Sequence, residues 1–214
     1  IKYRPYLIKE EKILMIALES KDEDQIEEAI IDIIGSCVET GIKTSALTIF
    51  DVEYIFLKLR SKSVGEKVEL NLSCDSCEEK NTIKVDLDKI EVKNKDKLKD
   101  LRIDLGNKLI VDIHFPLMSD KLSEDDKVTE VDTIISTIAK SIDTIYYGED
   151  SFNVKEVPYE EVKEFIEGLN SQQFQKIVDI LTNGPYISYD IKYKCKSCKE
   201  VNEHELKGLV DFFI

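Results

Sequence analysis

The sequence has no run of apolar residues long enough to cross a membrane. A spanning helix needs about 18 or more consecutive apolar residues, and no stretch approaches that length. The first residues, IKYRP, also lack the apolar core of a signal peptide. We therefore expect a soluble protein without a membrane span, made in a reducing cytosol.

Basic side chains are in deficit. The chain has 30 Lys and Arg residues against 44 Asp and Glu residues, a formal net charge of −14. Affinity for nucleic acid comes mainly from Lys and Arg displacing the counterions of the phosphate backbone. A surface this acidic would repel that backbone, so we expect no nucleic-acid partner.

Groups typical of catalysis are scarce as well. His114 and His204 are the two histidines, and the 8 glycines form no phosphate-binding loop. The sequence also has no nucleophile elbow and no His-Glu helix motif. We expect a protein that is not an enzyme, with no catalytic residues and no cofactor-binding residues.

Four of the five cysteines lie in a duplicated segment. Residues 68–81 (VELNLSCDSCEEKN) and 189–202 (YDIKYKCKSCKEVN) share an alternating strand, a Cys-x-Ser-Cys motif, and matched Glu and Asn residues. A returning strand follows each copy, in which His204 takes the place of Ile83 and is expected on the inner face of its strand. The pattern predicts two strand–knuckle–strand hairpins.

The spacing of these cysteines indicates a metal site. Two cysteines separated by two residues in a tight turn can place both sulfurs on one metal, and a structural zinc takes four ligands. Each knuckle supplies two ligands, so the two knuckles together complete a closed site. We predict one structural zinc per chain, bound by four thiolates: Cys74, Cys77, Cys195 and Cys198.

Other uses of the four cysteines remain open. Iron also binds four thiolates, disulfides form in oxidising compartments, and a redox Cys-x-x-Cys normally opens a helix rather than a hairpin turn. If a metal joins the pairs, it closes a loop of roughly 120 residues. By the chain-entropy model such a closure is worth about 4–5 kcal/mol.

The remaining periodicity predicts an α+β protein. Helical patterns cover residues 9–19, 22–38, 51–62 and 128–142, and two short helices precede Asn183-Gly184-Pro185. Asp51 and Ser171 are the expected caps of two of these helices. Cys37 falls on an apolar stripe and is expected in the core. Residues 88–102, dense in Lys and Asp, are expected to form a loop or an exposed hairpin end.

We expect one intertwined domain over residues 1–214, because the two knuckle hairpins must meet. Its sub-regions are a helical part (1–65), the first knuckle hairpin and strands (66–115), a helical middle (116–185), and the second knuckle hairpin with the C-terminal tail (186–214). The helix after Asp51 and the Phe212-Phe213 end are candidate partner surfaces that could equally be core.

Three segments carry a resemblance to a known family. Residues 4–14 (RPYLIKEEKIL), 50–66 (FDVEYIFLKLRSKSVGE) and 206–213 (LKGLVDFF) resemble the baseplate hub protein family of T-even-type contractile-tailed bacteriophages. The resemblance spans almost the whole chain, and paired cysteine motifs are similar to those in many members. It implies a late viral protein of tail assembly, located in the host cytoplasm during assembly or in the virion.

The resemblance implies no catalytic role, and it leaves two versions of the function open. One is a structural or assembly protein of the baseplate hub, and the other is an assembly chaperone, for the hub or the tape-measure protein, that is absent from the mature virion. The expected partners are other hub or tail proteins. A zinc-ribbon regulator that binds nucleic acid is a third interpretation, and the acidic charge argues against it. The oligomeric state and the host are not predicted.

Overall fold

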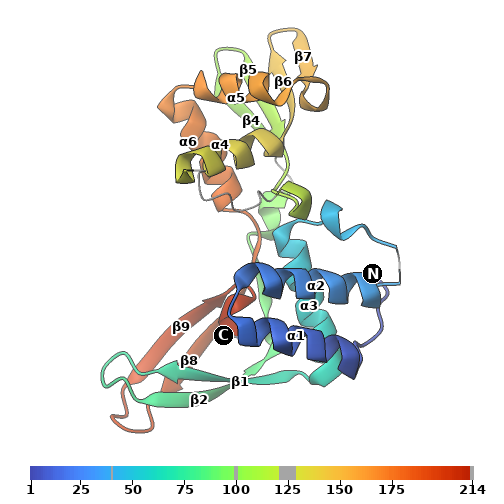
Figure 1. Cartoon of the computed structure of the whole chain (residues 1–214). Helices are drawn as coiled ribbons and strands as arrows, with labels where there is room; N and C mark the ends of the chain where they lie inside the picture. The colour runs from blue at the N-terminus through green and yellow to red at the C-terminus, as the bar shows by residue number, and fades with distance from the viewer. Residues whose placement is uncertain (40, 99–100, 121–128, 213–214) are drawn as a thin grey trace. The chain divides into compact units, whose positions relative to one another are not determined.

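The computed structural model describes residues 1–39, 41–98, 101–120 and 129–212. These residues form six α-helices and antiparallel sheets, which confirms the predicted α+β class. The chain divides into two compact units, one made of Ile1–Lys93 with Tyr186–Ile214 and the other of Asn94–Pro185 (Figure 1). We call them the knuckle unit and the inserted unit. The expectation of one intertwined domain over the whole chain stays a prediction.

Three helices form the first part of the knuckle unit: α1 (Ile8–Ser20), α2 (Glu23–Cys37) and α3 (Ile49–Val64). The side chain of Asp22 caps α2 by accepting hydrogen bonds from two amides of its first turn. The apolar stripe of α2 is buried as predicted, and Cys37 within it is 1% exposed. The three helices lie next to one another in Figure 1.

The start of α3 differs from the prediction. Its N-cap is Thr48, whose hydroxyl accepts a hydrogen bond from the amide of Asp51 at 3.1 Å. Asp51 instead occupies the third helical position, and its carboxylate accepts from the Thr48 amide at 3.2 Å. The two residues form a capping box, so Asp51 supports the helix start without being the cap. The helix ends at Gly65, whose φ of 125° suits a residue without a Cβ.

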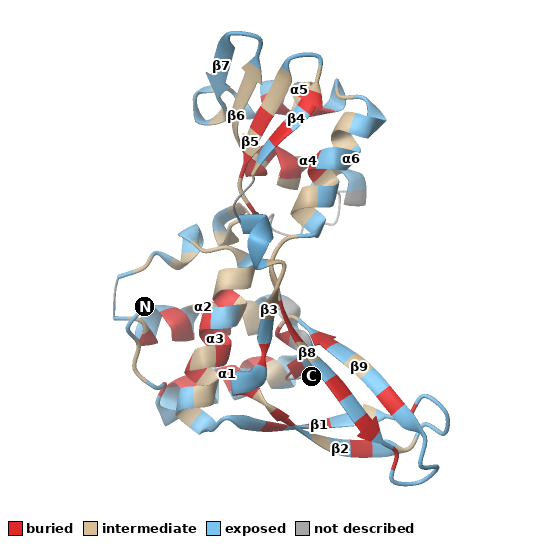
Figure 2. Cartoon of the chain, turned by 180° about the vertical axis from the view of Figure 1, so that it is seen from behind, coloured by how far each residue is buried: buried red, intermediate tan, exposed pale blue. Residues whose placement is uncertain are grey.

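Two long hairpins complete the knuckle unit. Strand β1 (Lys67–Ser73) pairs with β2 (Lys80–Asp86), and β8 (Tyr186–Lys194) pairs with β9 (Val201–Lys207), both antiparallel. Buried and exposed residues alternate along the second half of β8, before its cysteine turn (Figure 2). The tips of the two hairpins approach each other in both views. The repeat in the sequence is therefore a repeat in the fold.

A third strand joins the second hairpin. Strand β3 (Glu91–Lys93) pairs with the start of β8, so that Lys93 lies opposite Tyr186. It lies inside residues 88–102, which were expected to form a loop or an exposed hairpin end. The sheet order is β3-β8-β9.

Both candidate partner surfaces from the sequence contribute to the core, although α3 also has an exposed side that includes Tyr54 and Val64. Five apolar residues of α3 are buried: Val52, Ile55, Phe56, Leu57 and Leu59. Phe212 is 1% exposed, and α3 holds its segment because the Leu209 amide donates to Glu53 Oε1 at 3.1 Å. Residues 213 and 214 lie outside the described part of the chain.

The inserted unit is a sheet covered by helices. Its strands are β4 (Arg102–Gly106), β5 (Leu109–Ile113), β6 (Ile142–Tyr147) and β7 (Asp150–Asn153), in that spatial order. Helices α4 (Glu130–Ser141), α5 (Tyr159–Glu167) and α6 (Ser171–Thr182) pack against them. The core is one apolar cluster: Ile103, Leu105, Val111, Ile113, Ile138, Ala139, Ile142, Val162, Ile166 and Ile177.

The middle region contains β6 and β7 in addition to its helices, and β4 starts at the end of the expected loop. One helix cap of the inserted unit differs from the prediction. The N-cap of α6 is Asn170, one residue before the expected Ser171, and its side-chain oxygen accepts from Gln172 and Gln173 at 3.0 Å each. No helix among the described residues is long and apolar enough to cross a membrane.

Candidate metal centre

The two cysteine turns have the same backbone geometry. The amide of Cys74 donates to the Glu79 carbonyl at 3.0 Å, and the amide of Cys195 donates to the Glu200 carbonyl at 2.8 Å. In each turn the residue after the second cysteine has a positive φ, 58° at Glu78 and 66° at Lys199. Each turn therefore directs its two thiols the same way, as a duplicated knuckle should.

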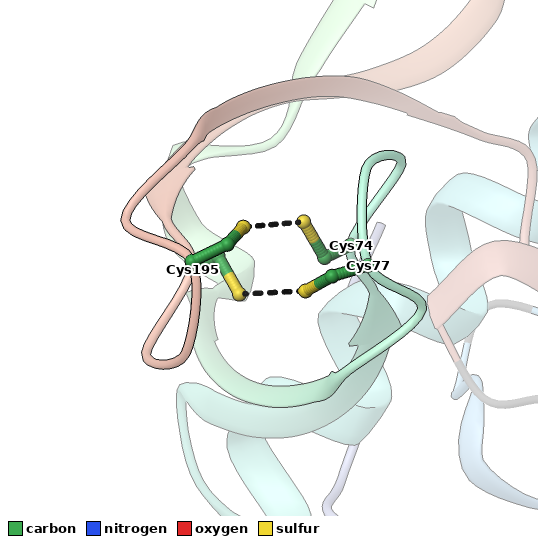
Figure 3. Close-up of side chains that lie close together, drawn as sticks. Cys74, Cys77 and Cys195 are labelled. Carbon is green, nitrogen blue, oxygen red and sulfur yellow. Dashed lines mark hydrogen bonds between the residues drawn. The ribbon is translucent and has the colours of Figure 1, made fainter.

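The four predicted cysteines come together. Their sulfurs all lie within 4.8 Å of one another, and two contacts cross between the knuckles: Cys74 to Cys198 at 3.6 Å and Cys77 to Cys195 at 3.7 Å (Figure 3). Four sulfurs placed tetrahedrally about 2.3 Å from one ion would lie about 3.8 Å apart. The observed spacing fits that arrangement, and all four cysteines are free thiols.

The cluster has a buried side and an exposed side. Cys74 and Cys195, the first cysteine of each knuckle, are 2% and 1% exposed, while Cys77 and Cys198 are exposed. In the described part of the chain, no other set of three or more His, Cys, Asp or Glu residues is arranged to hold a metal ion. A set of four sulfurs leaves no ligand position for water.

Hydrogen bonds favour the charged form of the two buried thiols. Burial opposes ionisation of Cys195, but the amides of Cys198 and Ser197 and the side chain of Asn81 lower its pKa to about 6. The amide of Ser76 is the main cause that lowers the pKa of Cys74. Turn amides aimed at the sulfur are what the knuckle geometry predicts, and they prepare a thiolate to bind a cation.

The exposed side behaves differently. The amide of Glu200 acts to lower the pKa of the Cys198 thiol. The hydrogen bond shared with Cys77 and burial among the other thiols outweigh it and raise that pKa to about 12. Several thiolates crowded together repel one another. A bound metal ion would supply positive charge to offset this repulsion, and its binding would release the proton of the Cys198 thiol.

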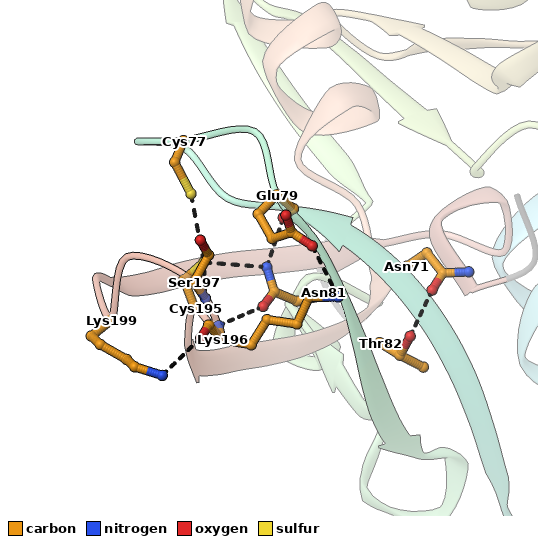
Figure 4. A network of polar contacts seen from close by, with 9 residues as sticks. All are labelled: Asn71, Cys77, Glu79, Asn81, Thr82, Cys195, Lys196, Ser197 and Lys199. Atoms are coloured by element: carbon orange, nitrogen blue, oxygen red, sulfur yellow. Dashed lines mark hydrogen bonds and ion pairs between the residues drawn. The ribbon is translucent and has the colours of Figure 1, made fainter.

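Two asparagines flank the buried thiols of the cluster, and neither was predicted to have a role. Asn81 and Asn202 are the matched asparagines of the repeat, and they are 4% and 1% exposed. The Nδ2 atom of Asn202 lies 3.5 Å from Cys74 Sγ. The Nδ2 atom of Asn81 lies 3.7 Å from Cys195 Sγ (Figure 4). The signal was their identical position in both copies, on strands whose alternation turns them inward.

The lysines around the second knuckle contact oxygen atoms. Lys196 forms an ion pair with Glu79 of the other knuckle at 3.0 Å, and Lys199 donates to the Lys196 carbonyl at 2.7 Å. Lys196 therefore adds a charge contact between the two turns.

The histidines lie outside this cluster. The ring of His204 stacks on Tyr193 with centroids 5.7 Å apart, and its Nε2 atom is 3.8 Å from Asp75 Oδ1. His114, in the inserted unit, lies 3.7 Å from Asp120 and 3.2 Å from Asp143. That the protein is not an enzyme stays a prediction.

Comparison with known proteins gives one finding. A family model described as T4 bacteriophage base plate protein matches residues 1–214. No curated protein and no solved structure matches the chain.

Proposed function

We propose that this chain, which belongs to the T4 bacteriophage base plate protein family, is a non-enzymatic structural or assembly protein of the baseplate hub. The match of the family model over residues 1–214 carries this proposal. The hub itself is supported by the three segments that resemble hub proteins. Its partners would be other proteins of the tail, met in the host cytoplasm during assembly and retained in the virion.

The four thiols support a structural rather than a catalytic role for a bound metal ion. Their spacing fits a tetrahedral zinc, and four protein ligands leave no open position at which water could be activated. Zinc would join hairpin β1–β2 to hairpin β8–β9. It would thus hold together two parts of the chain that are far apart in sequence.

Exposed apolar side chains on α1 offer a place for another baseplate protein to bind. Ile8, Met15 and Ile16 are 78%, 56% and 58% exposed, and their spacing places them on one side of the helix. Several large apolar side chains exposed on one side of a helix can mark a protein contact. Replacing Ile8 and Ile16 with glutamate should prevent incorporation into particles without changing the melting temperature, whereas Val201→Glu, on a different exposed surface, should not.

Quantitative mass spectrometry of purified particles tests the role. A fixed number of copies per tail, enriched with the baseplate fraction, is the result expected for a hub protein. Absence from particles despite abundance in infected-cell lysate would support the assembly chaperone instead. Absence from particles combined with no association with tail proteins in the lysate would contradict both versions.

The metal is tested separately. Protein purified without chelator should contain one zinc per chain by elemental analysis. Iron in its place, or no metal in protein whose thiols are reduced, would overturn the assignment of zinc.

A further inference from the structure

The contacts of the two buried asparagines cross between the knuckles in a reciprocal pattern. The side-chain oxygen of Asn81 accepts a hydrogen bond from the amide of Lys196, in the second knuckle, at 2.9 Å. The side-chain oxygen of Asn202 accepts from the amide of Asp75, in the first knuckle, also at 2.9 Å. Each asparagine thus binds the turn of the opposite hairpin, next to its first cysteine.

The donors of the two side chains are used in the same repeated way. Asn81 donates to the Glu79 carbonyl of its own turn at 2.7 Å and to Cys195 Sγ. Asn202 donates to the Glu200 carbonyl of its own turn at 3.2 Å and to Cys74 Sγ. Each side-chain amide therefore links its own turn to the opposite one, as Figure 4 shows for Asn81.

Burial makes these contacts matter. Both side chains are almost completely shielded from water, so a lost partner could not be replaced by solvent and would leave a polar group unsatisfied. An asparagine that only completed its own turn would need the one bond to the Glu79 or Glu200 carbonyl. The remaining donor and acceptor go to the other hairpin in both copies.

Two of the crossing bonds do not depend on sulfur chemistry. The bonds from the Lys196 and Asp75 amides to the asparagine oxygens need neither a thiolate nor a metal. The bonds to Cys74 and Cys195 act directly on two proposed ligands. Partners of this kind orient metal ligands and tune their affinity.

We infer that Asn81 and Asn202 form a reciprocal clasp that holds the two knuckles together before metal binds and that positions Cys74 and Cys195 for the ion. The second half of this inference rests on the proposed metal centre. The first half does not, because the clasp joins the backbones of the two turns. Metal then binds to a preformed site instead of assembling it.

Hydrogen exchange of the wild-type protein, followed by NMR after zinc has been removed with a chelator under reducing conditions, tests the first half. The Asp75 and Lys196 amides should remain protected in the metal-free protein. Exchange of both amides at the rate of a free peptide, with protection only after zinc is added, would show that the metal alone joins the knuckles and would overturn the clasp.

Single substitutions test the crossing pattern. Asn202→Ala should expose the Asp75 amide and leave Lys196 protected, while Asn81→Ala should do the reverse. Asn71→Ala is the matched control, because Asn71 lies on the same hairpin as Asn81 but its side chain accepts a hydrogen bond from exposed Thr82, at 2.9 Å, and does not cross between the knuckles. This control variant should leave the exchange rates of the Asp75 and Lys196 amides unchanged. If each single variant lost the protection of both amides together, the knuckles would be loosened generally, and this would contradict the reciprocal arrangement.

Metal titrations test the second half. Competition with a chromophoric chelator should show zinc binding roughly 10-fold to 100-fold weaker in Asn81→Ala and Asn202→Ala. The thiolate charge-transfer band of the cobalt(II)-substituted variants should move to lower energy, because a sulfur without its hydrogen bond donates electrons more readily. Unchanged affinity and spectrum would overturn the positioning role. A wild-type protein that binds neither metal, yet keeps both amides protected, would refute the metal centre and leave the clasp standing.

Discussion

The two units of this protein are stabilised in different ways. The inserted unit is one continuous stretch, Asn94–Pro185, built around an apolar cluster that its sheet and three helices share. The knuckle unit is assembled from two stretches of chain, and its hairpins end in four thiols and two buried asparagines. The apolar core of the inserted unit is drawn from one stretch of chain, whereas the knuckles need a specific polar arrangement between two separate stretches.

The largest effect should come from removing a thiol of the knuckle unit. Cys195→Ser should abolish zinc binding and destabilise that unit by about 4 kcal/mol, because the binding free energy of zinc no longer adds to the folding free energy and only the contacts between the knuckles then join the two turns. Hydrogen exchange followed by mass spectrometry should show faster exchange in hairpin β8–β9, with peptides of residues 101–120 and 129–185 unchanged. Cys37→Ala, at the buried cysteine outside the cluster, should keep its zinc. Equally faster hydrogen exchange in both units would show that they are not stabilised separately.

The reverse experiment removes apolar volume from the inserted unit. Ile177 is 0% exposed, and Ile177→Ala should cost about 2–5 kcal/mol through lost burial and the cavity left behind. Exchange should accelerate in α6 and its neighbours, while elemental analysis still finds one zinc per chain. Loss of zinc in this variant would mean that the knuckles depend on the inserted core.

A matched pair of helix caps gives a smaller effect in each unit. Thr48→Ala should destabilise α3, and Asn170→Ala should destabilise α6, each by about 1 kcal/mol because amides of the first turn lose their acceptor. Ser171→Ala is the control for the second variant and should change little, since Asn170 provides the cap. Chemical denaturation of each purified variant measures these differences. If Ser171→Ala had the larger effect, the assignment of the cap would be wrong.

The smallest expected effect is on how the stability of each unit depends on pH in acid. The hydrogen bond from Arg4, at 2.9 Å, lowers the pKa of Glu10 in the knuckle unit from 4.5 to about 2. A depressed pKa gives stability that is present above about pH 4.5 and is lost as the pH falls toward 2. Glu10→Gln should remove that pH dependence from the knuckle unit.

The inserted unit has its own acid-sensitive pair. The guanidinium of Arg102 donates two hydrogen bonds, of 2.6 and 2.7 Å, to Asp112 and lowers the pKa of that carboxyl. The same sign applies, so Asp112→Asn should flatten the acid dependence of the inserted unit alone. Urea unfolding between pH 2 and 5, read out by exchange in each unit, compares the two variants. A change in the other unit would contradict their independence.

The sequence predicted the elements whose signals are local or repeated. The alternation around each cysteine pair, the stripe of α2 containing Cys37, and the stop at Asn183-Gly184-Pro185 were all visible in short windows. The meeting of the two cysteine pairs followed from ligand count, because one pair cannot complete a four-ligand site. Whether zinc occupies it stays a prediction.

Features decided by distant partners were missed. Strand β3 is three residues long and exists through its pairing with β8, nearly a hundred residues later. The caps were misplaced by a few residues because Thr48 and Asp51, or Asn170 and Ser171, are all acceptable cap residues. The choice between them depends on backbone conformation. The roles of Asn81 and Asn202 appear only when the hairpins are brought together.

The pairing of Lys93 with Tyr186 decides where the inserted unit leaves and rejoins the knuckle unit. The inserted unit leaves from one strand and returns to its immediate neighbour, so its two ends are anchored by the β3–β8 ladder. Insertions are tolerated best where the ends of the added segment lie close together. A short turn between these two strands would restore a simple β-meander, β3-β8-β9.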